Sequence, residues 1–182
     1  MLFGLLIILV TIILFFILCV RLLISVIKKK PLPKKLMLTT LAGAIVFSLI
    51  YIYESYFFTF DEIERESMQE GFGPVISPTE KYTANAYYEP WGGVLGGVNV
   101  WIEITYHNER NKVKTIYYSD SKSSVYLNWK DEDTLFIQNE DPSYPNENRS
   151  IELDVETEIY DESGLACQSL IMKDDYERCY QD

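Results

Sequence analysis

The sequence has 182 residues, of which 48% are hydrophobic and 24% are charged, and its net charge is −11. The charge is divided unevenly: residues 1–60 carry six basic residues and one acid, whereas residues 61–182 carry ten basic residues and 26 acids, a balance of −16. This acidity argues against nucleic-acid binding, which depends on neutralising phosphates. A cationic peptide or a basic partner surface suits the negative electrostatic field of residues 61–182 better. The acidity is also explained if the charge serves only to keep the domain soluble.

The chain opens with a long apolar stretch. Residues 2–27 contain one charged residue, Arg21, and show no amphipathic period, which predicts a helix that crosses a membrane. A cleaved signal peptide is the rival interpretation, but no Lys or Arg precedes the stretch and no small-residue cleavage site follows it. Cys19 lies inside this stretch and is interpreted as a small buried hydrophobe.

A second span is predicted over residues 36–58, where Ala42, Gly43 and Ala44 suit close contact with the first helix. The turn between the spans and the end of the first span are basic, with Arg21, Lys28, Lys29, Lys30, Lys34 and Lys35. Short loops rich in Lys and Arg stay in the cytoplasm. Residues 1–60 therefore predict a transmembrane α-hairpin of a multi-pass cell-membrane protein, with the C-terminal domain outside.

Residues 61–76, DEIERESMQEGFGPVI, place five acids among the first ten positions. We expect an acidic stalk here, either as a short extension of the second helix or as a flexible link. Gly71, Gly73 and Pro74 are expected to end it.

The hydrophobic period changes to two in residues 77–182. Apolar and polar residues alternate over 82–88, 98–104, 125–129, 135–137 and 151–155, and residues 112–118 are rich in β-branched and aromatic side chains. This pattern predicts half-buried strands and an all-β antiparallel domain, either a small sandwich or an open barrel. The tail after Gly164 is expected to add a short helix over one edge. Cys167 and Cys179 are candidates for a disulfide if this domain is outside the cell.

Five features occur in a fixed order: SPTEKYTANAY at 77–87, a Gly-rich turn, VNVWIEI at 98–104, KTIYY at 114–118 and LNWKDEDTLFI at 127–137. In this order and spacing the sequence resembles a family of uncharacterised membrane-anchored proteins from Bacillus-like, Gram-positive bacteria. Thr79 stands where that family usually has Asp. The resemblance covers about residues 77–155 and implies a small all-β extracytoplasmic domain, without implying an activity.

The segment WGGVLGG at 91–97 is rich in glycine, but a strand follows it and it has no Lys, so a mobile hairpin connection is favoured over a phosphate loop. Trp91, Val94 and Leu95 at its tip form a candidate partner-contact loop.

Two acidic loops, at 131–133 and 139–141, could gather oxygens around a calcium ion, but their spacing matches no EF-hand, and solvated turns explain them. His107 is the only histidine in the sequence and lies in a polar loop without a nucleophile motif. No catalytic residue, metal ligand or cofactor is therefore predicted.

These features predict a membrane-tethered, non-catalytic extracytoplasmic binding or accessory protein, of which an immunity-type factor is one form. Its expected partners are the lipid bilayer and a protein or cationic peptide, and not nucleic acid. Two alternatives stay open, an envelope hydrolase that uses carboxylates and a purely structural membrane anchor. The sequence does not determine the oligomeric state.

Overall fold

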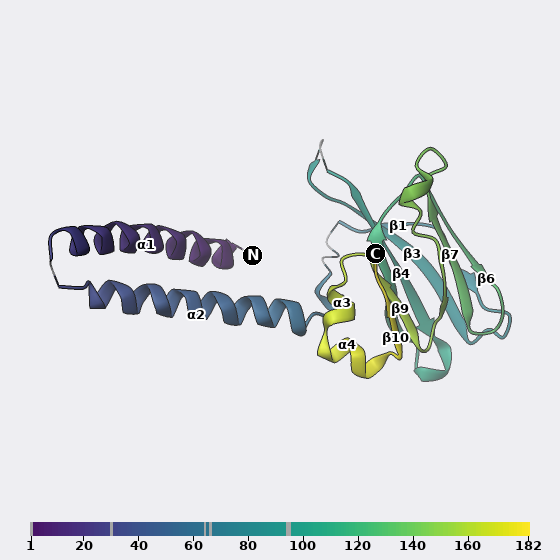
Figure 1. Ribbon diagram of the computed structural model, residues 1–182. Helices are drawn as coiled ribbons and strands as arrows, with labels where there is room; N and C mark the ends of the chain where they lie inside the picture. The colour runs from purple at the N-terminus through teal and green to yellow at the C-terminus, as the bar shows by residue number, and fades with distance from the viewer. Residues whose placement is uncertain (1, 30, 64, 66, 94–95) are drawn as a thin grey trace. The chain divides into compact units, whose positions relative to one another are not determined.

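The computed structural model describes residues 2–29, 31–63, 65, 67–93 and 96–182. The chain forms two compact units, Met1–Ser55 and Tyr56–Asp182. The first unit contains helix α1 (Leu2–Ile27) and most of helix α2 (Lys34–Tyr56), which lie side by side and run in opposite directions (Figure 1). Both helices are long and apolar enough to cross a membrane, and only 6% of the residues in either candidate span are buried.

The two helices approach closely at the small residues that the sequence indicates. A Cβ atom added to Gly43 would lie 2.9 Å from the Thr11 hydroxyl oxygen and 3.3 Å from the Thr11 methyl group. Glycine at this position therefore permits the helix contact. Polar side chains within α2 bond to their own helix: the Thr40 hydroxyl donates to the Leu36 carbonyl at 2.9 Å.

Seven of the described strands form the larger sheet of the second unit. They are β1 (Gln69–Glu70), β2 (Val75–Ile76), β3 (Tyr82–Pro90), β4 (Val98–Tyr106), β5 (Lys112–Asp120), β9 (Glu158–Asp161) and β10 (Arg178–Tyr180). The order is β1-β3-β4-β5-β9-β10, and β2 also pairs with β3. Pairings among β1 to β5 are antiparallel, whereas β9 joins β5, and β10 joins β9, in parallel.

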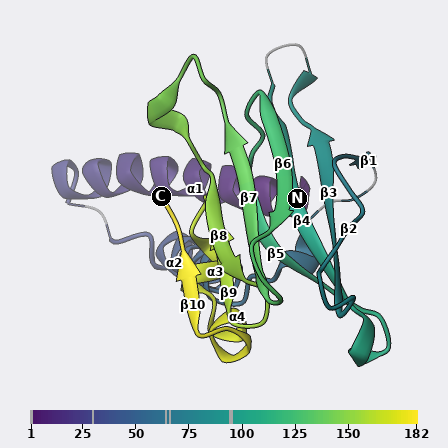
Figure 2. The ribbon, with the colours of Figure 1, turned by 90° about the vertical axis from the view of Figure 1, so that its right-hand side faces the viewer.

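A smaller antiparallel sheet contains β6 (Ser124–Trp129), β7 (Thr134–Glu140) and β8 (Ile151–Asp154). Its apolar face packs on the larger sheet. In Figure 2 the smaller sheet is seen in front of the larger one. The shared core includes Val100, Ile102, Ile104, Tyr117, Leu127, Leu135, Ile137 and Leu153, all at most 1% exposed. The predicted all-β domain is thus confirmed as two packed, mostly antiparallel sheets, and the described strands do not close into a barrel.

A bulge interrupts the pairing of β4 with β5. Ile102 lies opposite Tyr117 and Glu103 lies opposite Thr115, so Ile116 is the extra residue. Ile116 and Tyr117 are consecutive, yet both are completely buried. Tyr117 faces the smaller sheet, because its hydroxyl accepts a hydrogen bond from the Asn139 amide on β7 at 2.8 Å.

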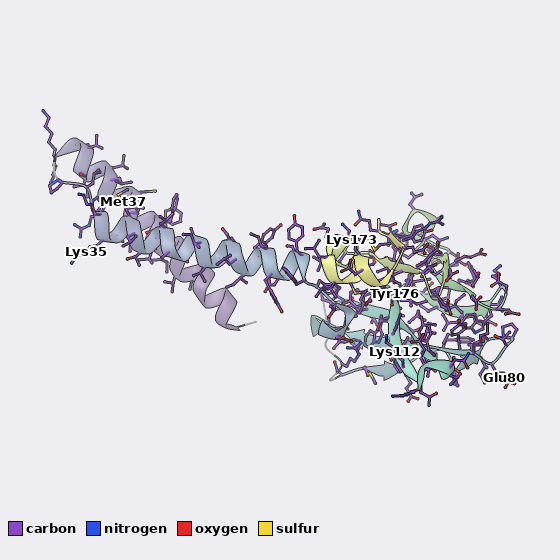
Figure 3. All side chains as sticks on the ribbon, turned by 90° about the horizontal axis from the view of Figure 1, so that it is seen from below. Lys35, Met37, Glu80, Lys112, Lys173 and Tyr176 are labelled. Atoms are coloured by element: carbon purple, nitrogen blue, oxygen red, sulfur yellow. A yellow bond between two sulfur atoms is a disulfide. The ribbon has the colours of Figure 1, made fainter. Side chains whose placement is uncertain are left out.

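The second face of the larger sheet is covered in part by α3 (Leu165–Gln168) and α4 (Leu170–Asp175). Tyr160 on β9 stacks on Tyr117, so its neighbour Ile159 points to the opposite face. There Ile159 meets Ala166 and Met172. Tyr176, which follows α4, packs against the same core (Figure 3). The helical tail expected after Gly164 is therefore present.

The sequence predicts a stalk over residues 61–76, but the structure folds this segment onto the domain. Helix η1 (Phe60–Glu62) begins with Phe60, which is 4% exposed, and Phe72 packs against the core. Strands β1 and β2 then pair with β3. Arg65 anchors the segment, since its guanidinium donates to the side chains of Glu103 on β4 and Thr115 on β5, both at 3.4 Å. It also donates to the carbonyls of Phe60 and Ile63 within the segment, at 3.2 and 3.1 Å. The many acids suggest a solvated stalk, whereas a few apolar side chains and one arginine attach the segment to the sheet.

Candidate functional site

A small pocket lies at one end of the two packed sheets. It encloses about 140 Å³ and is lined by Lys81, Tyr82, Tyr106, Asn108, Glu109 and Glu156. Tyr82 and Tyr106 are direct partners across β3 and β4. Asn108 and Glu109 come from η3 (His107–Glu109), and Glu156 comes from the turn between β8 and β9. We call this site the carboxylate pocket.

Aromatic rings form the floor of the carboxylate pocket. The rings of Tyr82 and Tyr106 meet edge to face, with centroids 5.4 Å apart, and Tyr82 also stacks on Trp129 at 5.9 Å. The Tyr82 hydroxyl donates to a carboxylate oxygen of Glu156, and the Tyr106 hydroxyl donates to the Val155 carbonyl. Both tyrosine side chains are almost completely buried, whereas Glu109 and Glu156 at the rim are exposed.

The electrostatic environment keeps both tyrosines protonated. Burial raises the pKa of Tyr82, and the adjacent Glu156 raises it further. Burial likewise raises the pKa of Tyr106, reinforced by Tyr176 and by Tyr82. The two hydroxyls therefore act as hydrogen-bond donors at neutral pH, and Glu156 retains acceptor capacity toward the pocket.

The charges around the carboxylate pocket favour a cationic group. Glu109 and Glu156 line it directly, and the one lysine in its lining, Lys81, pairs with Glu132 at 3.5 Å. Tyr106 already contacts a cation, because the Lys114 ammonium lies 5.3 Å from its ring centroid and 5.3 Å from that of Tyr176. Carboxylates beside tyrosine rings are a setting in which an ammonium or guanidinium group binds.

His107 forms a hydrogen-bonded chain beside this pocket. One ring nitrogen, Nε2, lies 2.8 Å from the Thr83 hydroxyl, and Nδ1 lies 3.0 Å from the Asn111 side-chain oxygen. The order hydroxyl, imidazole, amide is that of an activated nucleophile. However, His107 and Asn111 are exposed and the lining of the carboxylate pocket does not include Thr83 or His107. We interpret the chain as a brace that orders the loop between β4 and β5.

The acidic loops considered for calcium are used within the protein. One carboxylate oxygen of Asp131 accepts the backbone amides of Asp133 and Thr134 at 3.1 and 2.7 Å, and these bonds lower the pKa of Asp131. Asn139 is completely buried and bonds to Tyr117 and to the backbone of Lys122. Among the described residues, no group of three His, Cys, Asp or Glu side chains is placed to hold a metal ion.

Cys167 and Cys179 form the predicted disulfide, with Cα atoms 5.2 Å apart. The bond ties α3 to β10 and lines a second pocket of about 210 Å³, together with Ile159, Met172, Lys173 and Tyr176. The disulfide prediction is therefore confirmed.

The predicted partner-contact loop is described only in part. Trp91 is 50% exposed, while Val94 and Leu95 lie outside the described residues. Trp91 does not lie next to the carboxylate pocket, because it follows the end of β3 whereas Tyr82 begins that strand.

The predicted topology residues that the structure describes lie within α1 and around the turn that joins the two helices. Arg21 is within α1, Lys28 and Lys29 follow it, and Lys34 and Lys35 begin α2. Lys30 lies outside the described residues.

Sequence reasoning did not identify the carboxylate pocket. Its tyrosines resemble any half-buried strand residue, and Glu156 is one acid among many. The available signal is that Tyr82 and Tyr106 each stand at a strand end, beside a turn that contains acids. The pairing of β3 with β4 places the two tyrosines side by side, and the β8–β9 turn then brings Glu156 next to them.

Comparisons with known proteins place the chain in a family. No curated protein and no solved structure matches it. A family model matches residues 32–163, which include α2 and the sheets as far as β9, and the match ends before the disulfide. The chain therefore belongs to DUF5412, a family of unknown function.

Proposed function

We propose that this protein is a membrane-tethered, non-catalytic binding or accessory protein whose β domain lies outside the cell and binds a basic segment of a partner. Two exposed apolar helices support the tether, because side chains of this kind are stable in lipid and not in water. The basic residues between them support a cytoplasmic turn. The Cys167–Cys179 disulfide supports an oxidising compartment for the domain.

The carboxylate pocket is the observation that carries the binding part of this proposal. It offers two carboxylates, two buried tyrosines and a volume of about 140 Å³, a space that suits the end of one side chain better than a metabolite. The surrounding domain has a charge of −16 over residues 61–182, which would accelerate the approach of a basic partner. An accessory or immunity-type factor that binds a cationic peptide is one protein of this class.

We expect replacement of Glu156 by Gln to weaken the binding of basic peptides by roughly fivefold, since Glu156 is exposed and an exposed carboxylate contributes about 1 kcal/mol to an ion pair. Glutamine retains an oxygen that can accept the Tyr82 hydroxyl, so the floor should persist. The measurement is calorimetric titration of the full chain in detergent with an arginine-containing peptide and its glutamine counterpart.

Asp174→Asn provides the matched control, because Asp174 is exposed on α4 and is not part of the pocket lining. It removes the same charge and should leave the affinity within about twofold. If both substitutions weaken binding equally, or if neither peptide binds, the carboxylate pocket is not the binding site.

A further inference from the structure

An apolar groove runs between the two helices of the first unit. It encloses about 550 Å³ and is lined by Phe15 and Leu18 of α1 and by Lys34, Met37, Leu41 and Ala44 of α2. Leu38 and Thr40 of α2 also line it, and the α2 positions recur at intervals of three or four residues, so they form one stripe along the helix. The volume is within the range of about 300–1,000 Å³ that is typical of small-molecule sites.

The walls of the groove offer almost no polar group. Thr40 also lines it, but the Thr40 hydroxyl is satisfied by the Leu36 carbonyl of its own helix. Small side chains create the space, since Ala44 lines the groove beside Gly43, the residue at which the helices touch. In a bilayer such a space is filled by hydrocarbon, because water has no partner there.

The groove has one charged end. Lys34 is the first residue of α2 and the only charged one among the described residues of the lining, and its side chain is exposed. Residues 1–53 contain no Asp or Glu, so the sequence provides no nearby carboxylate to neutralise it. An apolar groove between membrane helices with a lysine at its end matches a lipid that has a negative headgroup.

We propose that this groove binds one anionic phospholipid, with an acyl chain between α1 and α2 and the headgroup phosphate on Lys34. The inference rests on the proposed membrane tether. It adds a specific ligand to that tether: the hairpin selects anionic lipid by one lysine, beyond the general attraction of the basic turn.

Lys35 gives a matched control for Lys34. It follows Lys34 directly and carries the same charge, but it does not line the groove. Residues two apart lie on nearly opposite sides of a helix, and Figure 3 labels Lys35 and the groove residue Met37 in the first turn of α2. A surface-charge effect should therefore respond equally to both lysines, whereas a lipid in the groove should respond to Lys34 alone.

The test is native mass spectrometry of the full chain in detergent, incubated with equal amounts of phosphatidylglycerol and phosphatidylcholine. We expect one retained phosphatidylglycerol, and a roughly fivefold loss of the preference in Lys34→Gln, the change that corresponds to about 1 kcal/mol. Lys35→Gln should retain it. Ala44→Phe should reduce retention of both lipids by filling the groove. Equal effects of the two lysine substitutions, or no lipid preference in the wild type, would overturn the proposal.

Alkaline extraction of membranes that contain the full chain separates this inference from the tether on which it rests. A chain that stays in the pellet but retains no phosphatidylglycerol refutes the lipid site only. A chain that is released into the supernatant refutes both.

Discussion

Glu162 joins three parts of the domain through one carboxylate. It accepts the Arg149 guanidinium at 2.8 Å, the Ser119 hydroxyl at 2.7 Å and the Asp120 backbone amide at 2.8 Å. Burial alone would raise the pKa of Glu162, but these hydrogen bonds outweigh it and hold the pKa below its ordinary value. Because the folded state favours the charged form, the stabilisation is present above the ordinary pKa of about 4.5 and is lost as the pH falls through the lower folded value.

Replacement of Glu162 by Gln should therefore destabilise the domain at neutral pH by about 1–2 kcal/mol. This is less than a fully buried, hydrogen-bonded carboxylate would contribute, because Glu162 is partly exposed to solvent. The difference from wild type should shrink as the pH falls below about 4.5. Denaturant unfolding followed by tryptophan fluorescence measures this, because all three tryptophans lie in residues 77–182. A difference that is constant with pH would show that the charge of Glu162 does not matter.

Some residues of the core network are visible only in the folded chain. Asn139 belongs to an acidic loop by sequence, yet it is completely buried and joins β7 to Tyr117 on β5. Alternation predicts which face of a strand is buried, and Ile137 follows that rule. Alternation cannot predict that this position holds a buried amide. A buried amide is stable only when it is hydrogen-bonded, and the partners of Asn139 lie about twenty residues away in the sequence.

At the scale of elements, the segment between α2 and β3 gives the clearest departure from sequence reasoning. Arg65 donates to Glu103 on β4 and to Thr115 on β5, both at 3.4 Å, and Glu103 also accepts the indole N–H of buried Trp101 at 3.2 Å. One side chain thus connects residues 60–65 to two strands of the larger sheet.

We expect Arg65→Ala to destabilise the domain by about 1–3 kcal/mol, because it removes a charged donor from the partly buried Glu103 and from the carbonyls of Phe60 and Ile63. Trp101 should report the change directly in its fluorescence. Lys112→Ala is the control, since Lys112 is an exposed cation at the start of β5 (Figure 3) and should change stability by less than about 0.5 kcal/mol. Equal stabilities of the two variants would mean that residues 61–76 are only loosely attached.

Long alternating strands such as β3 and β4 could be predicted from sequence, because nine residues with a period of two allow few other structures. Strands β1 and β2, at two residues each, carry no period. The parallel pairing of β9 with β5 is equally hidden, since it depends on where the chain returns after β8. The carboxylate pocket depends on the same return, because Glu156 belongs to that turn. The short elements that position the pocket are therefore the ones that the sequence leaves open.

At the scale of the whole molecule, charge is separated along the chain. The hairpin region has six basic residues against one acid, and residues 61–182 carry −16. This charge distribution favours one orientation in a membrane, with the basic turn on the cytoplasmic side. The disulfide favours the same direction, since reducing compartments do not retain such bonds. In the proposed orientation, the carboxylate pocket is accessible to extracellular partners only.

This orientation predicts the accessibility of two engineered cysteines in a background with Cys19→Ala. Lys28→Cys, in the turn, should not react with a membrane-impermeant maleimide applied to intact cells, and it should react after the cells are opened. Lys112→Cys, on the β domain, should react in intact cells, because its position is exposed. Both sites replace a lysine, so charge does not distinguish them. The reverse pattern would place the domain in the cytoplasm, where the carboxylate pocket would meet a different set of basic partners and the disulfide would be reduced.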